Sequence, residues 1–375
     1  MAVAAAPATG QPSAAKVSDV IASFRPTKLF RLAKQNTSIT SLDFDDSGEF
    51  LLAACDDESL QLYNCKEGKH VKTLLSQKYG AHLARFTHHA QSVIYSSTKV
   101  DDGIRYLSTH DNQFLRYFKG HTAPVTCLTL SPSSDNFMSC SLDNTVKLWD
   151  LSSSHPQGEL RLHGAYFSAY DPSATVIAIA SPSTSSILLY DLRNYDKPPF
   201  ATFDLLSTEK VFAPQHVGHP GNSYWTKLEF SNDGKSLLIA TNGPGHYLLD
   251  AFDGHVKAFI ARRTGSTPPS RLAPGGASSN PNSQPPPPAG QGDACFSPDG
   301  RYIIGGAGPA GDMVVWDAHA SPGPDKKLRP VAELLCKGRP AAVVEYNPRL
   351  NLIASADREL VFWLPDPEAN VGGGP

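Results

Sequence analysis

Residues 120–150 read GHTAPVTCLTLSPSSDNFMSCSLDNTVKLWD, a stretch that begins with Gly-His and ends with Trp-Asp. Between these two dipeptides lie three short runs of strand-forming residues, VTCLTL, NFMSCS and TVKLW, separated by turn-forming residues. Short strands joined by tight turns predict a small antiparallel sheet. If this unit is repeated, it decides the fold of nearly the whole chain.

The same pattern recurs along the chain. Each copy has an apolar run that ends in an aromatic residue or leucine, then a turn such as SPDG (297–300), then a compact apolar run. In SPDG, Pro presets φ for the turn and Gly supplies the left-handed position that a hairpin needs. The seven anchor residues are Phe44, Phe86, Leu130, Tyr170, Phe230, Phe296 and Tyr346. Their spacings are 42, 44, 40, 60, 66 and 50 residues, and a base period of about 40–45 residues is that of a β-propeller blade.

The sequence therefore predicts an all-β, seven-bladed propeller over residues 21–365. The last copy ends in LVFWLPDPEANVGGGP, whose prolines and glycines cannot supply a fourth strand. The segment FRPTKLFRLAKQ (24–35) precedes the first complete copy and belongs to no blade of its own. We expect it to pair as the outer strand of the last blade and so to close the ring.

Other segments fall outside the period. Residues 1–20 and 366–375 are predicted to be flexible tails. The segment 263–292 is rich in Pro, Gly and Ser and lacks apolar periodicity, so a disordered loop between copies five and six is expected. A second insertion, LLSTEKVFAPQHVGHPGNSYW (205–225), separates copies four and five.

Composition narrows the class of protein. The 375 residues carry a net charge of -3, which argues against a general nucleic-acid or membrane-surface binder. No apolar run approaches the ~20 residues that span a bilayer. The six cysteines show no C-x-x-C spacing, so we expect free thiols in a reducing compartment.

The stretch 120–150 resembles a WD40 repeat, whose usual frame is Gly-His followed by Trp-Asp. The resemblance implies a side-chain network of His121, Ser139, Asp143 and Trp149 that ties the strands of the blade together. Ser, His and Asp also form hydrolase triads, but the Trp and the repeat context favour a structural role. No P-loop, G-x-S-x-G or H-E-x-x-H motif occurs. We therefore predict no catalytic residues, no cofactor and no metal site.

Acidic residues gather after the second strand of copies one and two: Asp56, Asp57 and Glu58, then Asp101 and Asp102. A turn of this kind needs one Asp for its own loop, so the surplus carboxylates are expected to face solvent on one rim of the ring. Plain solvation would explain them. The alternative is a docking rim for a basic segment of a partner.

Several fragments resemble one WD-repeat family more closely: DDGIRYLSTHDNQFLRYFKGH (101–121), FSNDGKSLLIATNG (230–243), LLDAFDGHV (248–256) and FWLP (362–365). They are similar to the small WD-repeat subunit shared by the COMPASS histone methyltransferase and the nuclear mRNA 3′-end machinery. The resemblance runs through all seven copies. Residues 263–292 and the Ala-rich start depart from it.

This resemblance implies a nuclear, non-catalytic scaffold. The implied partners are the catalytic and other subunits of COMPASS, which methylates lysine four of histone three, subunits of the cleavage and polyadenylation factor, and, indirectly, the tail of RNA polymerase II. An adaptor of another complex, with protein phosphatase one or in ubiquitination or RNA processing, is the alternative. An enzyme using the propeller channel is disfavoured, because it needs convergent acid, base or metal ligands on the inner strands, and the sequence shows no such pattern.

Overall fold

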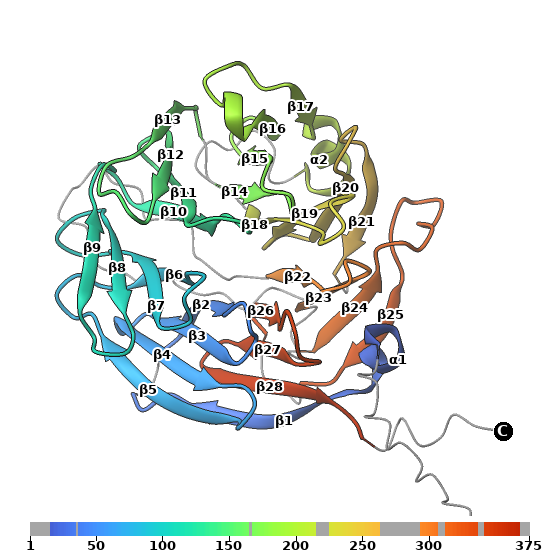
Figure 1. Cartoon of the computed structure of the whole chain (residues 1–375). Coiled ribbons are helices and arrows are strands. Elements are labelled where there is room, and N and C mark those ends of the chain that lie inside the picture. The colour runs from blue at the N-terminus through green and yellow to red at the C-terminus, as the bar shows by residue number, and fades with distance from the viewer. Residues whose placement is uncertain are drawn as a thin grey trace, which may run out of the picture.

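The computed structural model describes residues 16–34, 37–164, 167–214, 225–262, 293–306, 312–336 and 341–367. Within them the chain forms seven four-stranded antiparallel sheets, arranged as blades around a common centre (Figure 1). The predicted all-β, seven-bladed propeller is confirmed.

Each of the first six blades is built from four strands that follow one another along the chain. Blade one holds β2 (Ile39–Phe44), β3 (Phe50–Cys55), β4 (Ser59–Asn64) and β5 (Lys69–Leu75). Blade two holds β6 (His82–Phe86), β7 (Ser92–Ser96), β8 (Ile104–Ser108) and β9 (Phe114–Phe118). Blade three holds β10 (Val125–Leu130), β11 (Asn136–Ser141), β12 (Thr145–Asp150) and β13 (Gly158–Arg161).

The next three blades follow the same order. Blade four holds β14 (Phe167–Tyr170), β15 (Val176–Ser181), β16 (Ser186–Asp191) and β17 (Ala201–Asp204). Blade five holds β18 (Trp225–Phe230), β19 (Ser236–Thr241), β20 (Gly245–Asp250) and β21 (Val256–Ala261). Blade six holds β22 (Ala294–Phe296), β23 (Tyr302–Gly306), β24 (Met313–Asp317) and β25 (Pro330–Leu334).

Blade seven closes the ring with the two ends of the chain. It joins β26 (Val343–Tyr346), β27 (Ile353–Ala356) and β28 (Glu359–Pro365) to β1 (Phe24–Arg31), which pairs antiparallel with β28. Figure 1 shows β1 as the outermost strand beside β28. The expected closure by the N-terminal strand is therefore confirmed.

The core lies between the blades. The buried apolar side chains form seven clusters, and each cluster joins two neighbouring blades, including blades seven and one. The second strand of each blade is buried along most of its length, as in β7 and β19. Strands covered on both faces carry continuous apolar runs, which is why these runs do not alternate in the sequence.

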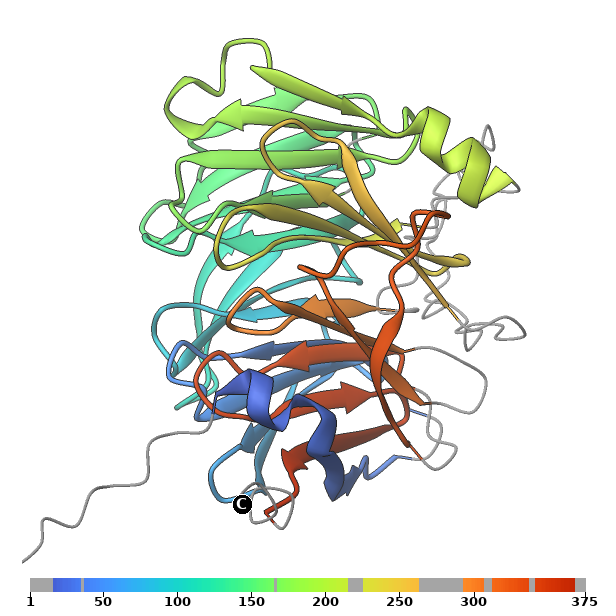
Figure 2. The ribbon, with the colours of Figure 1, turned by 90° about the vertical axis from the view of Figure 1, so that its right-hand side faces the viewer.

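The N-terminal boundary differs from the expected tail at residues 1–20. Helix α1 (Val17–Val20) and the short 3₁₀ turn η1 (Ile21–Ser23) precede β1, and Val20 and Ile21 are buried in the cluster between blades six and seven. These two apolar side chains anchor the segment there. Figure 2 shows the short blue helix in front of the strands of the last blades. Residues 1–15, the whole segment 263–292 and residues 368–375 of the predicted tail at 366–375 lie outside the described residues.

Candidate functional site

The structure brings His121, Ser139, Asp143 and Trp149 together in blade three. Ser139 lies on β11 and Trp149 on β12, Asp143 lies in the turn between these strands, and His121 precedes β10. His121 Nδ1 lies 2.9 Å from Asp143 Oδ2, and His121 Nε2 lies 2.6 Å from Ser139 Oγ. The Trp149 indole Nε1 donates to Ser139 Oγ over 2.8 Å. The four side chains thus connect the loop, the turn and two strands.

The donors and acceptors of this network run in one direction. An indole nitrogen only donates, so the Ser139 oxygen accepts from Trp149 and its own O–H points to His121 Nε2. His121 Nδ1 then donates to Asp143, which also accepts from Thr145 Oγ1 over 2.6 Å. Burial raises the pKa of Asp143, but the hydrogen bonds from His121 and Thr145 outweigh it and hold the pKa well below its ordinary value.

This Ser-His-Asp arrangement offers no accessible nucleophile. Ser139 is fully buried, and the His121 and Asp143 side chains are 1% and 8% exposed. A substrate carbonyl could not approach Ser139 Oγ, whose hydrogen and lone pair are already used within the blade. The geometry is that of a structural clamp.

Other blades keep only part of this clamp. In blade seven the Trp363 indole donates to Ser355 Oγ over 2.9 Å. In blade six the register places Gly305 where blade three has Ser139, and the buried Trp316 indole nitrogen has no hydrogen-bond partner among the described residues. The neighbouring His246 Nε2 is likewise buried without a partner in this part of the chain. The Trp-Asp ending alone therefore does not predict the network.

The insertion between copies four and five carries a buried acid that sequence reasoning missed. Helix α2 (Leu206–Phe212) places Glu209 at 2% exposure. Its Oε1 accepts from the Trp225 indole over 2.8 Å, and its Oε2 accepts from the Ser185 hydroxyl. Glu209 thus links blade four to the first strand of blade five. Residues 215–224 of this insertion lie outside the described residues.

The structure places the predicted acidic rim in turns of blades one and two. Asp56, Asp57 and Glu58 lie in the turn between β3 and β4, Asp101 and Asp102 precede β8, and an ion pair between Lys99 and Glu58 joins the two turns. All five carboxylates are half-buried. The two turns lie side by side, and the docking role of their carboxylates stays a prediction.

Most of these carboxylates are used within the turns themselves. Asp56 accepts from the Ser38 backbone N–H over 2.9 Å, Asp57 from the Ser59 hydroxyl over 2.6 Å, and Asp101 pairs with Arg105 at 2.5 Å. Asp102 forms no hydrogen bond with the described residues. Burial, followed by the neighbouring Asp101 carboxylate, raises the pKa of Asp102.

Charged residues on the inner strands line a cavity at the centre of the ring. The expectation that no acidic or basic residues converge on the inner strands is therefore corrected. The cavity measures about 430 Å³, and its lining includes Asp43, Arg85, Lys227, Glu229 and Glu345. Lys227 Nζ lies 2.9 Å from a carboxylate oxygen of Glu229 and 2.9 Å from one of Glu345. Four of the five residues stand immediately before an anchor, at positions 43, 85, 229 and 345, and this position was the signal that could have found them.

The inner carboxylates also link neighbouring blades. Asp43 Oδ2 accepts from the Phe86 backbone N–H over 2.6 Å, and Glu229 Oε1 accepts from the Phe296 N–H over 3.2 Å. Burial raises the pKa of Asp43 to about 7 against the opposing effect of Arg85. Burial likewise raises the pKa of Glu229 to about 7 against Lys227. The backbone contacts give both carboxylates a role in holding the ring.

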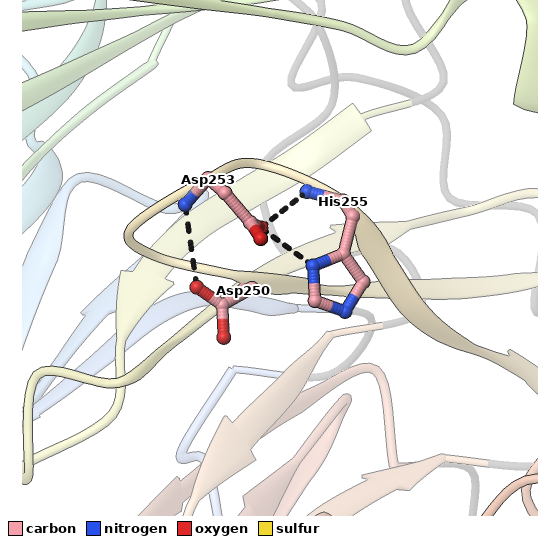
Figure 3. Close-up of side chains that lie close together, drawn as sticks. All are labelled: Asp250, Asp253 and His255. Carbon is pink, nitrogen blue, oxygen red and sulfur yellow. Dashed lines mark hydrogen bonds and ion pairs between the residues drawn. The ribbon is translucent and has the colours of Figure 1, made fainter.

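One group of possible metal ligands occurs among the described residues, in the hairpin turn between β20 and β21 (Figure 3). Asp250 Oδ1 accepts from the Phe252 N–H over 2.8 Å, and its Oδ2 pairs with Lys257 at 3.0 Å. Asp253 Oδ1 accepts from the His255 N–H over 3.0 Å and contacts His255 Nδ1. These bonds close the turn, so the group has a sufficient structural explanation.

Cysteines and helices add no further site. All six cysteines are free thiols, and five of them are buried. In the described part of the chain no helix has the length and apolar character needed to cross a membrane.

Comparisons with known proteins agree with the fold. The family profile "WD domain, G-beta repeat" matches residues 26–64 and 112–150. Each matched segment begins at the outer strand of one blade and ends with the third strand of the next, as expected where a repeat spans two blades.

Two relatives are matched along nearly their whole length, and a third is matched over a shorter part. WD repeat-containing protein 82 of Drosophila melanogaster is 39% identical over 356 residues, which cover 94% of this chain and 98% of that protein. COMPASS component SWD2 of Saccharomyces cerevisiae is 34% identical over 346 residues, covering 92% and 96%. Set1 complex component swd2 of Schizosaccharomyces pombe is 44% identical over 236 residues, or 63% of each chain. The chain therefore belongs to the WD-repeat family of WD repeat-containing protein 82 and SWD2.

Proposed function

We propose that this chain is a non-catalytic scaffold subunit of a nuclear Set1/COMPASS-type histone methyltransferase complex. The observation that carries the proposal is the 34% sequence identity, over 92% of this chain, to a COMPASS component. A rigid ring of seven blades offers several separate surfaces for partner subunits. The one Ser-His-Asp set described is buried, which supports a scaffold over a hydrolase.

Purification of the tagged chain from its own cells tests the proposal. After nuclease treatment, we expect quantitative mass spectrometry to recover a Set1-type methyltransferase and other COMPASS subunits at near-stoichiometric amounts. The isolated chain should not methylate histone three, whereas the recovered complex should. Recovery of a stable complex without a methyltransferase would contradict the proposal.

The finer part of the proposal concerns further partners. Subunits of the cleavage and polyadenylation factor, and an indirect link to the tail of RNA polymerase II, rest on the sequence resemblance. Adaptor roles with protein phosphatase one, in ubiquitination or in RNA processing are the alternatives. The same purification separates them, because each predicts a different set of recovered subunits.

We also propose that the acidic turns contact a basic segment of a partner, chiefly through Asp102. This carboxylate is half-buried and has no hydrogen bond to the described residues. Asp102→Asn should weaken recovery of that partner and leave the melting temperature unchanged. Reversing Asp57 or Asp101 would instead break the bonds of the turns and destabilise the fold.

A further inference from the structure

Blade two exposes an aromatic surface on its outer strand. The described residues include thirteen exposed large apolar side chains, and six of these lie on β5, on β9 or just before β8. Phe114, Leu115 and Tyr117 of β9 are 36%, 50% and 38% exposed. The outer strands β13 and β17 expose only polar or charged side chains. Charged edges of that kind discourage pairing with other chains. The exposed side chains within β9 are instead Phe114, Leu115 and Tyr117, and Figure 1 shows this strand at the rim of the ring.

A bulge in β9 gathers these aromatic rings on one face. The pairing of β8 with β9 shifts between Leu107–Phe114 and Tyr106–Arg116, so Leu115 is the extra residue. Phe114 and Tyr117 therefore point to the same side, whereas a spacing of three would otherwise place them on opposite faces. Their ring centroids lie 5.3 Å apart.

Tyr79 from the loop after β5 completes the cluster. Its ring lies 5.5 Å from that of Phe114 and 6.3 Å from that of Tyr117. Beneath the rings the Arg105 guanidinium lies 4.0 Å from the Tyr79 centroid and 4.8 Å from the Tyr117 centroid. Arg105 is itself held by Ser97 at 2.9 Å and by Asp101 at 2.5 Å. The rings are thus fixed before any partner arrives, which lowers the entropy lost on binding.

Val100 adds an exposed aliphatic side chain in the loop whose backbone is hydrogen-bonded to Tyr79. The Tyr79 carbonyl accepts from the Thr98 and Lys99 N–H groups over 2.9 and 2.8 Å, and Val100 follows directly. Val100 is 76% exposed and has φ 69. A β-branched residue is strained there, and such strain gathers at binding sites. We call Tyr79, Val100, Phe114 and Tyr117 the edge patch.

Apart from Asp102, which lies two residues after Val100, the charge that remains around the edge patch is positive. Glu58 and Asp101 are neutralised by Lys99 and Arg105. Lys78 Nζ lies 5.1 Å from the Tyr79 centroid.

Three further cations lie on the strand or beside it. Lys119 follows β9 directly. Within β9, Arg116 Nη1 donates to the Leu151 carbonyl, and Lys72 Nζ of β5 donates to the Thr109 carbonyl. None of these three, nor Lys78, forms an ion pair with a described carboxylate. Asp111, in the turn before β9, is the one exposed acid of that turn.

We propose that the edge patch and the open edge of β9 dock an extended segment of another protein, in which acidic residues flank an apolar or aromatic side chain. The segment pairs with the free backbone groups of β9, its apolar side chain packs on Tyr79, Phe114 and Tyr117, and its carboxylates meet Lys78, Arg116 and Lys119. This mode of recognition is β-strand addition. It is independent of which complex the chain enters.

A display library of 12-residue peptides, selected on the purified full-length chain, tests the proposal. Enriched peptides should carry acidic residues beside an apolar one. The double variant Phe114→Ser/Tyr117→Ser should weaken them by about tenfold or more, as expected for central aromatic anchors. Phe200→Ser is the matched control, because Phe200 is 61% exposed in blade four, and it should bind like the wild type.

Two further arms separate binding from folding. Val100→Gly relieves the left-handed strain, so it should keep or raise the melting temperature while it weakens the peptides. Lys78→Glu/Lys119→Glu should weaken acidic peptides in low salt. The proposal would be overturned if the selection yields basic peptides, or if no selected peptide depends on Phe114 and Tyr117. It would also be overturned if a 12-nucleotide single-stranded RNA binds tightly and the same double variant loses that binding.

Discussion

Blades three and six end their third strands with the same Trp-Asp pair, yet their tryptophans lie in different surroundings. Trp149 donates to Ser139, Ser139 donates to His121, and His121 donates to Asp143. Trp316 is equally buried, but Gly305 stands in the place of that serine. The Trp316 indole nitrogen has no partner within the described ranges. One residue on the second strand therefore decides whether the tryptophan joins a polar network or only packs.

Converting blade three to the pattern of blade six should have the largest effect. Ser139→Gly removes the acceptor of Trp149 and the donor to His121, at about 1–3 kcal/mol for each buried group left unpaired, and glycine in a strand adds about 0.5–1 kcal/mol. We expect the midpoint of urea unfolding to fall sharply. Ser139→Ala keeps the backbone restraint of a side chain. It should therefore avoid the added cost of glycine in a strand but still lose the free energy of the hydrogen bonds. Equal stability of Ser139→Gly and the wild type would remove Ser139 from the network.

Neutralising the acid of the network should have the next largest effect, and one that depends on pH. The pKa of Asp143 is depressed in the folded state, because the bonds from His121 and Thr145 outweigh its burial. Its contribution is therefore fully present above the unfolded pKa of about 4 and is lost as the pH falls below it.

Asp143→Asn keeps the shape of the side chain and loses the charge. At pH 7 it should cost about 1.5–3 kcal/mol, the range for hydrogen bonds to charged groups. Chemical denaturation of both proteins from pH 7 to pH 3 measures the difference, which should shrink below about pH 4. A difference that stays constant over this range would contradict the assigned charge.

A matched pair of tryptophan variants sharpens the comparison further. Trp149→Phe loses a hydrogen bond and leaves the Ser139 oxygen without its donor, whereas Trp316→Phe removes a nitrogen that had no partner. Both lose similar packing. We expect Trp149→Phe to be the more destabilising by about 1 kcal/mol. Equal losses, measured by thermal and urea unfolding, would show that packing alone matters at both sites.

Sequence reasoning reached the repeat, the closure of the ring and the blade-three residues, because each rests on local patterns of strand, turn and Trp-Asp. It missed the inner carboxylates Asp43 and Glu229, which match no catalytic motif and are recognised only by their position before the anchors. Glu209 was out of reach, since its partners Ser185 and Trp225 lie in different blades. For the acidic turns, the sequence did not reveal that nearby backbone and side-chain donors bind Asp56, Asp57 and Asp101.

The smallest and most specific effect should come from restoring a hydroxyl in blade six. His246 Nδ1 accepts from the Thr241 N–H over 3.0 Å, and burial holds the pKa of His246 well below its ordinary value, so the neutral ring carries its proton on Nε2. Both His246 Nε2 and Trp316 Nε1 are then buried donors without an acceptor.

Gly305→Ser would place an oxygen with two lone pairs beside these donors, since a Cβ built on Gly305 lies 3.5 Å from His246 Nε2. The same Cβ lies 3.1 Å from that of Ala294 and 3.3 Å from the Asp293 carbonyl oxygen, so any side chain here meets close neighbours. Gly305→Ala carries that crowding without the oxygen and is the matched control. We expect the serine variant to be more stable than the alanine variant by about 1 kcal/mol, the usual worth of one hydrogen bond. If the alanine and serine variants melt at the same temperature, the hydroxyl does not reach the two donors. The difference between blades three and six would then be one of packing rather than of hydrogen bonding.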